Sequence, residues 1–421
     1  MKGDAVVIGS GISGLSISGM LREHYNVKIL ERADKTGGLI KCKRVNGNLF
    51  HLVGGHVFNS KRKEVLDWFW NHFDRDKEFV KATRNAKILI NDQLIGYPIE
   101  NFIYQLPPEQ AQYIIKELTA ITVQKTDLNQ YSDFEAFLKS RFGQALYDIY
   151  FGPYNTKLWN TDLSKVPLEW LDGKLPMPEI KTILSNNVLK REEADMVHST
   201  FYYPVYNGSQ FIIDRLAQDL DISLSYEVSS ITYSDKRLSV NSGMYTPDVL
   251  IYCGDVRTLH NIIEIDDIDL ADSLAAVKDL LSNGTSNVLC KTDENDLSWL
   301  YLPESKFKAH RIIYTGNFSG TNNDGSSRKT CVVEFSGKYD EQTMIDELKL
   351  LPGNLKPLSF NYEPNSYIIH QKDTRSKIAA LKKQLEKYNI YLLGRFAEWE
   401  YFNMDKCIES AMDLRGKLAE N

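Results

Sequence analysis

Three glycines near the N-terminus are spaced to hold a phosphate group. Gly9, Gly11 and Gly14 follow the apolar run AVVI in the pattern G-x-G-x-x-G, and they open a segment of helical spacing. The first glycine allows a tight turn, the second lets a pyrophosphate approach the backbone, and the third lets the helix pack closely on a sheet. The N-terminus of that helix would then present free N–H groups and a partial positive charge to the phosphates.

An acidic residue completes this pattern. Glu31 ends the next apolar run, NVKILE, and lies 20 residues after Gly11. A carboxylate at this position can accept a hydrogen bond from a hydroxyl group of an adenosine ribose. The motif therefore predicts a dinucleotide cofactor, and by itself it leaves FAD and NAD as alternatives.

Two later glycine pairs favour FAD. Gly37–Gly38 lie in KTGGLIKC, and Gly54–Gly55 lie in LVGGHVFN. Backbone without side chains can approach a bulky, rigid ring system closely. His56 follows the second pair directly, and by residue type alone a histidine beside glycines is more often a structural hydrogen-bonding residue than a catalyst.

A run of aromatic and basic residues lies in the middle of the chain, at 151–160. Tyr154, Lys157 and Trp159 belong to FGPYNTKLWN, and Tyr150 comes just before it. Such a cluster could stack a nucleobase on its aromatic faces while the cation meets a phosphate. An aromatic helix packed into a core is the alternative interpretation.

The stretch LLGRFAEWEYFNMDKC, at 392–407, mixes charged and aromatic side chains near the end of the chain. This mixture fits neither a core strand nor a plain solvent-facing segment. An amphipathic C-terminal helix capped by Asn403 is the simplest interpretation from the residues alone.

The composition indicates a globular protein of several domains. The chain has 421 residues, of which 43% are hydrophobic and 25% are charged. Its net charge of −6 and its pI near 5.8 argue against a generic nucleic-acid-binding protein. If the substrate is an anion, it must therefore be bound by individual basic side chains at its site, because the protein as a whole carries a negative charge.

The cysteines and the apolar runs indicate a cytoplasmic protein. Five cysteines are scattered along the chain without a CxxC pair, which argues against structural disulfides and a zinc site. The N-terminus shows no cleavable signal, and no run approaches the roughly 18 apolar residues that would span a bilayer. We therefore expect a cytoplasmic location and no transmembrane segment.

The spacing of apolar residues predicts the elements that must position these motifs. Residues 5–31 are expected to form a strand, a helix and a strand, and residues 87–99 a hairpin that turns at Asn91–Asp92. Helices are expected between 107 and 151. Several prolines predict a loop-rich connector over 153–178.

The later part of the chain is rich in strands and closes with a helix at about 404–418. The predicted fold class is α/β, with a Rossmann-like FAD-binding domain, a helical insertion and an antiparallel β-sheet substrate domain. The expected domains are a discontinuous FAD-binding domain of 1–75, 205–260 and 388–421, a mainly helical substrate or lid domain of 100–200, and a β-rich substrate domain of 76–99 and 261–387.

The N-terminal motifs together resemble a flavoprotein superfamily. The order of Glu31, a Gly-Gly pair and GGHVF is similar to the FAD domain of flavin amine oxidases and protoporphyrinogen oxidases. Within that group, GGHVF is most similar to the GxHxF segment of UDP-galactopyranose mutases. The resemblance implies FAD as the cofactor, active in its reduced form, and it places His56 beside the isoalloxazine ring.

The run at 151–160 resembles the YTxKQW signature of the same family, in which aromatic side chains hold the uridine. Tyr154, Lys157 and Trp159 match this signature by type and spacing. Tyr150 stands where the family has an aromatic partner for the base. The resemblance thus implies a nucleotide-binding role for this run.

Other segments match substrate-side positions of the family. HRIIYTGNF is similar to a strand whose arginine meets the substrate pyrophosphate, which implies that role for Arg311. FYYPVYNG implies a sugar-side contact for Tyr206, and SYIIHQKD implies a phosphate contact for Tyr367. Two positions depart from the family: Glu100 replaces a substrate-contacting asparagine, and Lys174 is the nearest basic residue to a second expected arginine.

The C-terminal stretch resembles the family segment that leads into a helix under the flavin. The resemblance implies a close approach at Gly394, support of the reduced flavin by Arg395, and a diphosphate contact for Tyr401. A helix that begins at 403–405 would direct its N-terminus at the flavin. Its dipole would stabilise the negative charge of the reduced ring.

The resemblance implies a flavin-dependent mutase that interconverts pyranose and furanose forms of a nucleotide sugar, for surface polysaccharide precursors. Reduced FAD would attack the anomeric carbon, without net redox change. An FAD-dependent oxidoreductase of the amine oxidase or protoporphyrinogen oxidase type is the alternative, and a flavin-binding protein without turnover is a third hypothesis. The sugar and the base stay open, as does a homodimeric state.

The predicted site residues form three sets, with no metal site. The catalytic set is His56, Arg311 and Lys174. The cofactor-binding set is Gly9, Gly11, Ile12, Ser13, Gly14, Glu31, Arg32, Gly38, Leu39, His56, Val57, Val228, Gly394, Arg395, Asn403, Met404 and Asp405. The substrate-binding set is Tyr150, Tyr154, Lys157, Trp159, Tyr206, Arg311, Tyr367 and Tyr401.

Overall fold

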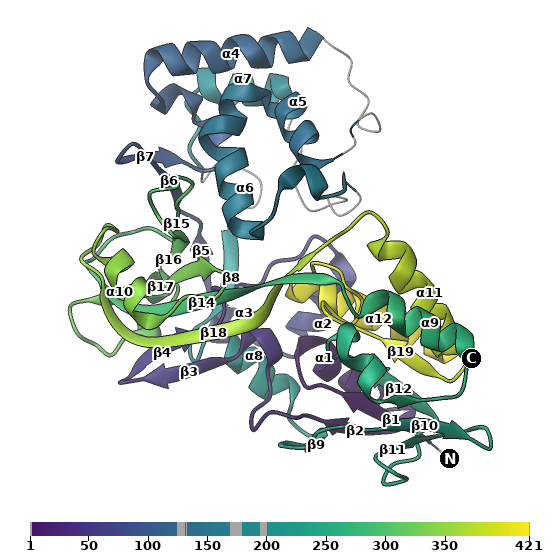
Figure 1. The fold of residues 1–421 in the computed structure, drawn as a ribbon. Coiled ribbons are helices and arrows are strands. Elements are labelled where there is room, and N and C mark those ends of the chain that lie inside the picture. The colour runs from purple at the N-terminus through teal and green to yellow at the C-terminus, as the bar shows by residue number, and fades with distance from the viewer. Residues whose placement is uncertain (1, 124–130, 132, 169–178, 194–199, 421) are drawn as a thin grey trace.

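The computed structural model of the chain describes residues 2–123, 131, 133–168, 179–193 and 200–420. These residues form two large sheets and a group of helices that lies above both sheets in Figure 1. The α/β class predicted from the sequence is confirmed.

A five-stranded parallel sheet brings together the beginning, the middle and the end of the chain. Its order is β19-β12-β1-β2-β9, and every neighbouring pair is parallel. The strands are β1 (Gly3–Ile8), β2 (Tyr25–Leu30), β9 (Asp221–Ser223), β12 (Val249–Tyr252) and β19 (Ile390–Leu392). Parallel neighbours align their carboxyl ends at one edge of the sheet, so loops from distant segments of the chain meet there.

Apolar layers cover both faces of this sheet, because successive side chains of a strand point to opposite faces. Val7 packs on one face in a core with α1 (Ile12–Leu21), α2 (Lys63–Trp70), α8 (Ser209–Leu216) and α12 (Met404–Glu420). Val6 packs on the other face with α9 (Ile268–Val277), α11 (Thr374–Glu386), β10 (Ile231–Ser234) and β11 (Arg237–Val240). The predicted final helix is thus confirmed, and it begins at Met404.

A seven-stranded sheet forms the second layer, in the order β18-β14-β17-β16-β15-β6-β7. The strands are β6 (Ala86–Ile90), β7 (Gln93–Gly96), β14 (Leu281–Thr292), β15 (Trp299–Tyr301), β16 (Ala309–Ile313), β17 (Lys329–Ser336) and β18 (Lys356–Ile369). Its neighbouring strands are antiparallel except β6 and β15, which run parallel. The sheet predicted as antiparallel is therefore mixed at one junction. Helix α10 (Glu341–Leu348) packs against it.

Strands β6 and β7 form the predicted hairpin. Its two turn residues, Asn91 and Asp92, have φ angles of 50° and 60°. A two-residue turn that follows the twist of the strands needs positive φ at both positions, and Asn and Asp tolerate this conformation. The hairpin prediction is confirmed for this reason.

Four helices form the helical body at the top of Figure 1: α4 (Pro108–Val123), α5 (Phe134–Leu146), α6 (Gly152–Trp159) and α7 (Ile180–Val188). The predicted loop-rich connector over 153–178 is wrong in its first part, because α6 occupies it. Pro153 lies in the first turn of α6, where a missing N–H loses no helical hydrogen bond. Residues 169–178 lie outside the described part of the chain.

Two small sheets connect these bodies. One pairs β3 (Cys42–Val45) with β4 (Asn48–His51), and the other pairs β5 (Phe79–Thr83) with β8 (Thr200–Pro204). A short helix, α3 (Arg75–Glu78), precedes β5, and β13 (Ile263–Glu264) extends the sheet of β10 and β11. Across the described residues, no helix combines the length and the apolar character that a membrane crossing requires.

Candidate functional site

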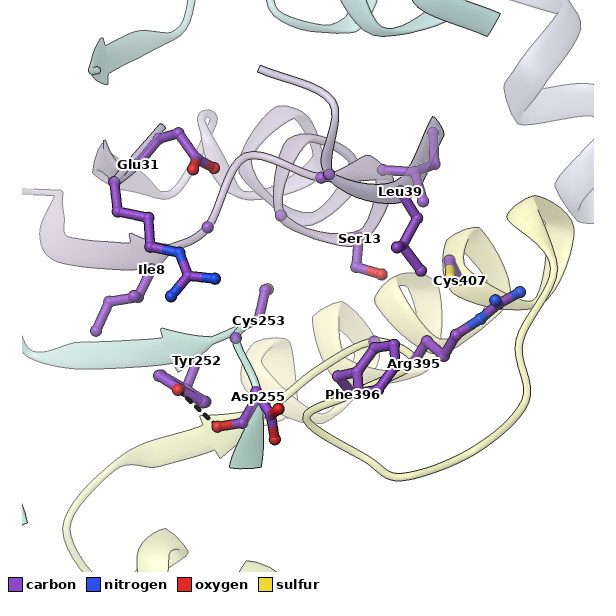
Figure 2. A pocket seen from close by; sticks show the side chains of 18 of the residues that line it. Ile8, Ser13, Glu31, Leu39, Tyr252, Cys253, Asp255, Arg395, Phe396 and Cys407 are labelled. Carbon is purple, nitrogen blue, oxygen red and sulfur yellow. Dashed lines mark hydrogen bonds between the residues drawn. The ribbon is translucent and has the colours of Figure 1, made fainter. Parts of the chain in front are cut away.

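A cavity of about 510 Å³ opens at the carboxyl ends of β1, β2 and β12. Figure 2 shows Glu31 on one side of it and Arg395 on the other. Most of the predicted cofactor-binding residues line this cavity: Gly9, Gly11, Ile12, Ser13, Gly14, Glu31, Arg32, Gly38, Leu39, His56, Val228, Gly394, Arg395, Asn403 and Met404. The fold thus gathers residues from both ends of the chain around one space of ligand size.

The glycine motif forms the tightest part of the wall. A Cβ atom at Gly14 would lie only 2.0 Å from the carbonyl oxygen of Gly9. Gly9 itself has a φ of 105°, a conformation that favours glycine. A Cβ at Gly11 would lie 3.8 Å from the Cα of Gly38, so the two glycine segments approach each other at the cavity. The geometry agrees with the reasons for which the motif needs glycine.

Glu31 is fixed in place by the loop it follows. One of its carboxylate oxygens accepts hydrogen bonds from the backbone N–H and the hydroxyl of Ser10, at 2.8 and 2.7 Å. The other oxygen accepts one from the N–H of Ala33, at 2.9 Å. The carboxylate therefore has a defined orientation at the cavity wall, as recognition of a ribose hydroxyl requires.

The C-terminal segment closes the opposite side. Gly394 has a φ of 99°, and a Cβ there would lie 2.6 Å from the hydroxyl oxygen of Ser13. The guanidinium of Arg395 donates to the carbonyl of Phe402 at 2.9 and 2.6 Å and to the carbonyl of Ser366 at 3.0 Å. Contacts with backbone carbonyls thus hold this positive charge at the cavity.

Two predicted cofactor residues lie outside the cavity wall, and several unpredicted ones lie within it. Val57 packs against the core of the helical body, and Asp405 does not reach the cavity. The residues that sequence reasoning missed include Tyr252, which ends β12, and Cys253 and Asp255, which follow it. The Tyr252 hydroxyl donates to the carbonyl of Asp255 at 2.9 Å (Figure 2). A buried strand that ends in Cys-Gly-Asp repeats the strand-to-glycine pattern of β1, and that signal could have revealed them.

His56 lies where the cavity meets a second group of residues. Burial, and then the positive charge of Arg395, lowers the pKa of His56 to about 4, so the ring is neutral at pH 7. Its Nε2 atom is buried without a hydrogen-bond partner among the described residues. A Cβ at Gly54 would lie 3.8 Å from this atom, 3.6 Å from Nη2 of Arg311 and 3.7 Å from Oε2 of Glu334. Gly54, which has no side chain, therefore lies between His56 of the cavity wall and a charged cluster that contains Arg311 and Glu334.

A buried carboxylate organises this charged cluster. Oε1 of Glu334 accepts hydrogen bonds from Arg311 at 2.6 Å and from the Tyr367 hydroxyl at 3.0 Å, and it lies 2.8 Å from Nε2 of His310. The Tyr367 hydroxyl also accepts from Arg311 at 3.0 Å. Because its proton goes to Glu334, Tyr367 here orients Arg311 and does not offer a donor to a ligand.

The ions of this cluster stabilise one another. Burial alone would raise the pKa of Glu334, but the charge of Arg311 and then His310 hold that pKa well below its usual range. Nε of Arg311 is buried without a partner among the described residues, so the guanidinium keeps donor capacity for an anion. Sequence reasoning found Arg311 and missed Glu334, whose signal is a lone acid within the apolar strand TCVVEF.

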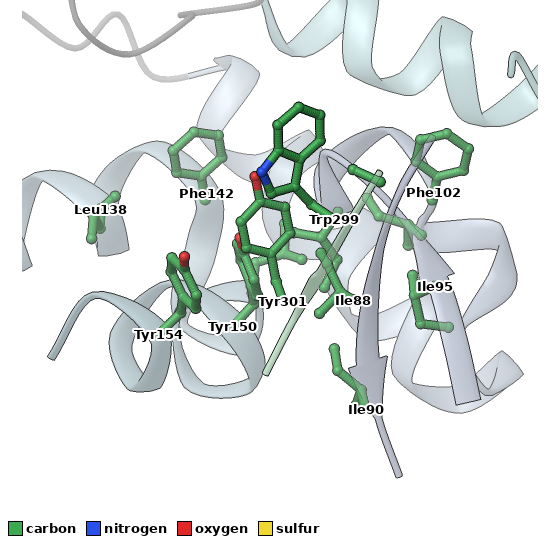
Figure 3. Close-up of a cluster of buried hydrophobic side chains, with 14 of the residues drawn as sticks. Ile88, Ile90, Ile95, Phe102, Leu138, Phe142, Tyr150, Tyr154, Trp299 and Tyr301 are labelled. Atoms are coloured by element: carbon green, nitrogen blue, oxygen red, sulfur yellow. The ribbon is translucent and has the colours of Figure 1, made fainter. Parts of the chain in front are cut away.

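Predicted aromatic residues surround this cluster. The rings of Tyr150 and Tyr154 stack at 5.4 Å with an angle of 11° between their planes. Figure 3 shows both side chains within the buried hydrophobic cluster. Tyr367 and Tyr401 stack at 5.8 Å, and Trp159 meets both rings edge-on. Core packing, the alternative interpretation of the aromatic run, is confirmed for Tyr150, Tyr154 and Trp159. Stacking of a nucleobase on these rings stays a prediction.

Three predicted residues are not part of this cluster. The Lys157 ammonium donates to the carbonyls of Leu302, Glu304 and Ala309, at 2.7, 2.8 and 3.4 Å, so it ties α6 to the segment between β15 and β16. Its hydrogens therefore have acceptors within the protein, which does not favour the predicted phosphate contact. Tyr206 is 58% exposed and lies against Arg44 of β3. Lys174 lies outside the described residues.

Known proteins resemble this chain along its whole length. The family model of an NAD(P)-binding Rossmann-like domain matches residues 7–73. The UDP-galactopyranose mutase of Mycoplasma genitalium is 22% identical, over 96% of this chain and 92% of that protein. A solved structure of reduced UDP-galactopyranose mutase superposes with a TM-score of 0.87 at 20% identity, covering 100% of this chain and 94% of the other. This chain is therefore similar to UDP-galactopyranose mutases in sequence and in fold. The resemblance seen in the sequence motifs is confirmed.

Other relatives show the breadth of this similarity. The dTDP-fucopyranose mutase of Escherichia coli is 27% identical over 41% of this chain and 45% of that protein. Wild-type putrescine oxidase bound to putrescine superposes with a TM-score of 0.67 at 13% identity, with complete coverage of both chains. The fold is thus shared with an oxidase, while the relatives from Mycoplasma genitalium and Escherichia coli, which are similar in sequence, are mutases.

Proposed function

We propose that this chain is a flavin-dependent nucleotide-sugar mutase that interconverts pyranose and furanose forms, with FAD as its cofactor. The observation that carries the proposal is the position of Arg311, which lies beside Gly54, close to the cavity residue His56, and has free donor capacity at Nε. A guanidinium there can bind the diphosphate of a substrate whose sugar reaches the cavity. Similarity to a UDP-galactopyranose mutase and a dTDP-fucopyranose mutase supports this reaction class.

FAD fits the cavity through features of this chain. Gly9, Gly11 and Gly14 would admit its pyrophosphate at the N-terminus of α1, and Glu31 would bind its ribose. The unpartnered Nε2 of His56 has a free hydrogen-bonding position for the ring system. When bound and reduced, FAD would supply the nucleophile for the anomeric carbon of the sugar.

The residues of the chain would position the substrate and stabilise charge. Arg311 would neutralise the diphosphate as it leaves, and Glu334 and Tyr367 would hold the guanidinium in place. The fixed charge of Arg395 would favour an anionic reduced flavin. The Tyr150–Tyr154 stack would bind the base.

An FAD-dependent oxidoreductase is the second candidate, since putrescine oxidase shares the fold. An oxidase that acts on an apolar amine would favour an apolar tunnel beside the flavin. The buried Arg311–Glu334 ion pair next to the cavity, with the unpartnered Nε of Arg311, favours an anionic substrate instead.

The test uses the FAD-loaded protein reduced with dithionite, without oxygen. It is mixed separately with UDP-galactose, UDP-N-acetylgalactosamine and a dTDP-6-deoxyhexose, and the sugars are separated by chromatography. We expect a furanose product with no stoichiometric oxidation of the flavin. A parallel reaction uses the oxidised protein in air, and substrate consumption coupled to oxygen uptake there would support the oxidoreductase. No product from any nucleotide sugar in the anaerobic reaction would contradict the mutase.

A further inference from the structure

A buried carboxyl group in the helical body has no role in the mechanism above. Glu100 belongs to the short turn η2 (Ile99–Asn101), and only 4% of its surface is exposed. Within the described ranges it forms no ion pair, and no other side chain hydrogen-bonds to its carboxyl. Because burial penalises a charge that has no partner, the neutral form of such a group is favoured.

The carboxyl lies beside the stacked tyrosines. Burial is the main cause that raises the pKa of both Tyr97 and Tyr150, and the nearby Glu100 adds to both shifts. Tyr150 stacks on Tyr154, and Tyr97 stacks on Tyr301 at 4.7 Å. Aromatic faces of this kind stack nucleobases. A carboxyl beside them is therefore placed to meet the edge of a stacked base.

The cation that packs on Tyr97 is engaged by other groups. Arg84 lies over the ring of Tyr97 at 4.5 Å and donates to the Tyr301 hydroxyl at 2.8 Å. Its Nε atom lies 3.3 Å from a carboxylate oxygen of Glu193. Arg84 thus has its own counter-ion, and it does not neutralise Glu100.

The elements that pack on η2 bring no charged side chain close to the carboxyl of Glu100. The side-chain amide of Asn187 on α7 donates to the backbone carbonyl of Glu100 at 2.8 Å and leaves the carboxyl free. Lys181, the charged residue of α7, is exposed, and β7 has no charged residue. Burial therefore dominates, and it raises the pKa of Glu100 to about 7.

We propose that Glu100, when protonated, reads the hydrogen-bonding edge of a pyrimidine base, an inference that rests on the nucleotide-sugar function proposed above. A protonated carboxyl presents one donor beside one acceptor. Uracil and thymine present a complementary N–H and C=O pair, so two hydrogen bonds form together. A carboxylate can only accept hydrogen bonds. It would therefore repel the C=O group of uracil or thymine, whereas it could accept from the two neighbouring N–H donors of guanine. Loss of one proton would therefore weaken pyrimidine binding.

The first test measures binding of UDP-galactose to the FAD-loaded protein by calorimetry, from about pH 6 to about pH 8.5. The diphosphate diester of this probe does not titrate in that range. We expect the affinity to fall as pH rises through 7, by up to about tenfold per pH unit, because binding requires the proton on Glu100. Titration in two buffers of different ionisation enthalpy should show net proton uptake near pH 7.5.

Two isosteric variants locate the effect. Glu100→Gln keeps a donor beside an acceptor and cannot ionise, so its affinity for UDP-galactose should be independent of pH in this range. Glu193→Gln is the matched control, because burial also raises the pKa of Glu193 to about 7 but this carboxylate lies beside Arg84. The control should keep the pH dependence of the wild-type protein.

The outcomes separate this inference from the mutase proposal. A wild-type affinity for UDP-galactose that is constant with pH, or a binding reaction without proton uptake, would overturn the role of Glu100 while furanose formation still supports the mutase. An affinity for UDP-galactose that rises with pH would also overturn it, because a carboxylate would then be the form that binds uracil. Failure to bind any nucleotide sugar, with FAD retained, would contradict the proposed function itself. The proton-uptake measurement uses only the wild-type protein, so it remains decisive if Glu100→Gln does not fold.

Discussion

The cofactor cavity and the charged cluster beside it are built in different ways. The cavity is shaped by backbone: glycines at the ends of parallel strands, with Gly14 and Gly394 in contacts too close for any side chain. The cluster is built from side chains on β16, β17 and β18 of one sheet, with Glu334 at its centre. A site shaped by the backbone requires several glycines close together in the sequence, so it can be recognised as a motif. A site made of side chains from separate strands requires only isolated residues, so the sequence around each of them gives little indication of it.

The largest expected effect comes from removing the charge of Arg311. Arg311→Met leaves Glu334 buried without its main counter-ion, and loss of one partner of a buried pair costs about 3 to 5 kcal/mol. We expect a matching fall in the free energy of unfolding and loss of nucleotide binding, with FAD still bound. Denaturant unfolding, calorimetry with UDP-galactose and flavin absorbance measure the three quantities.

A double variant separates stability from binding in that experiment. Arg311→Met combined with Glu334→Gln removes the orphaned charge, so it should recover most of the lost stability without recovering nucleotide binding. Loss of the flavin from the single variant, at full stability, would show that Arg311 belongs to the cofactor cavity and not to the substrate.

The next effect concerns the backbone of the cavity. Gly14→Ala places a Cβ 2.0 Å from the carbonyl oxygen of Gly9, so the helix must move away from the sheet. We expect a loss of about 3 kcal/mol, at the upper end of overpacking costs, together with weaker FAD binding. Gly19→Ala is the matched control on α1, because no atom lies within 4 Å of its added Cβ. The control should be stabilised by about 0.5 to 1 kcal/mol, and equal behaviour of the two variants would contradict the close-packing argument.

Acid should destabilise the protein through two buried histidines, His56 at the cofactor cavity and His51 beside Tyr203 in the core. Burial lowers the pKa of His51 to about 3 and that of His56 to about 4. Both are held neutral in the folded state, so their contribution is present above pH 6.5 and is lost as pH falls below it. Each should remove about 1.4 kcal/mol of stability between about pH 7.5 and about pH 5.5.

Single variants assign these two contributions. His51 contacts Tyr203 in the buried network of β4, whereas His56 lines the cavity. Denaturant unfolding of His51→Asn and His56→Asn at both pH values should show a smaller acid effect in each. Added FAD should protect the His56 contribution more than that of His51, and an unchanged acid effect in both variants would contradict these assignments.

The smallest expected effect distinguishes Lys157 from Arg311. Lys157→Met removes an ammonium that donates to three carbonyls, which should cost about 1 to 2 kcal/mol of stability. The affinity for UDP-galactose should stay within about twofold, or under about 0.5 kcal/mol, because the ammonium is used inside the protein. A tenfold weaker affinity would restore the phosphate role that the sequence resemblance implies.

Local patterns could be predicted where backbone geometry dictates residue type. The turn at Asn91–Asp92 needs positive φ, and Gly9, Gly11 and Gly14 need space, so both were visible in the sequence. The connector over 153–178 was predicted wrongly at its start, because Pro153 is a helix breaker only away from the first turn. Proline disrupts the interior of a helix but is compatible with its first turn, and the position of Pro153 at the start of α6 decides which applies.

The sequence alone determined the α/β class and the strand–glycine–helix motif with Glu31, because these depend on short-range spacing. The place of the C-terminal segment beside the cofactor site was implied by the family resemblance. Tertiary structure decided which single polar residues became functional candidates. Glu334 gained its role because Arg311, His310 and Tyr367 converge on it across three strands and burial removes water from between them. Glu100 gained its own because the fold buries it without a counter-ion, a relation between distant residues that no local pattern encodes.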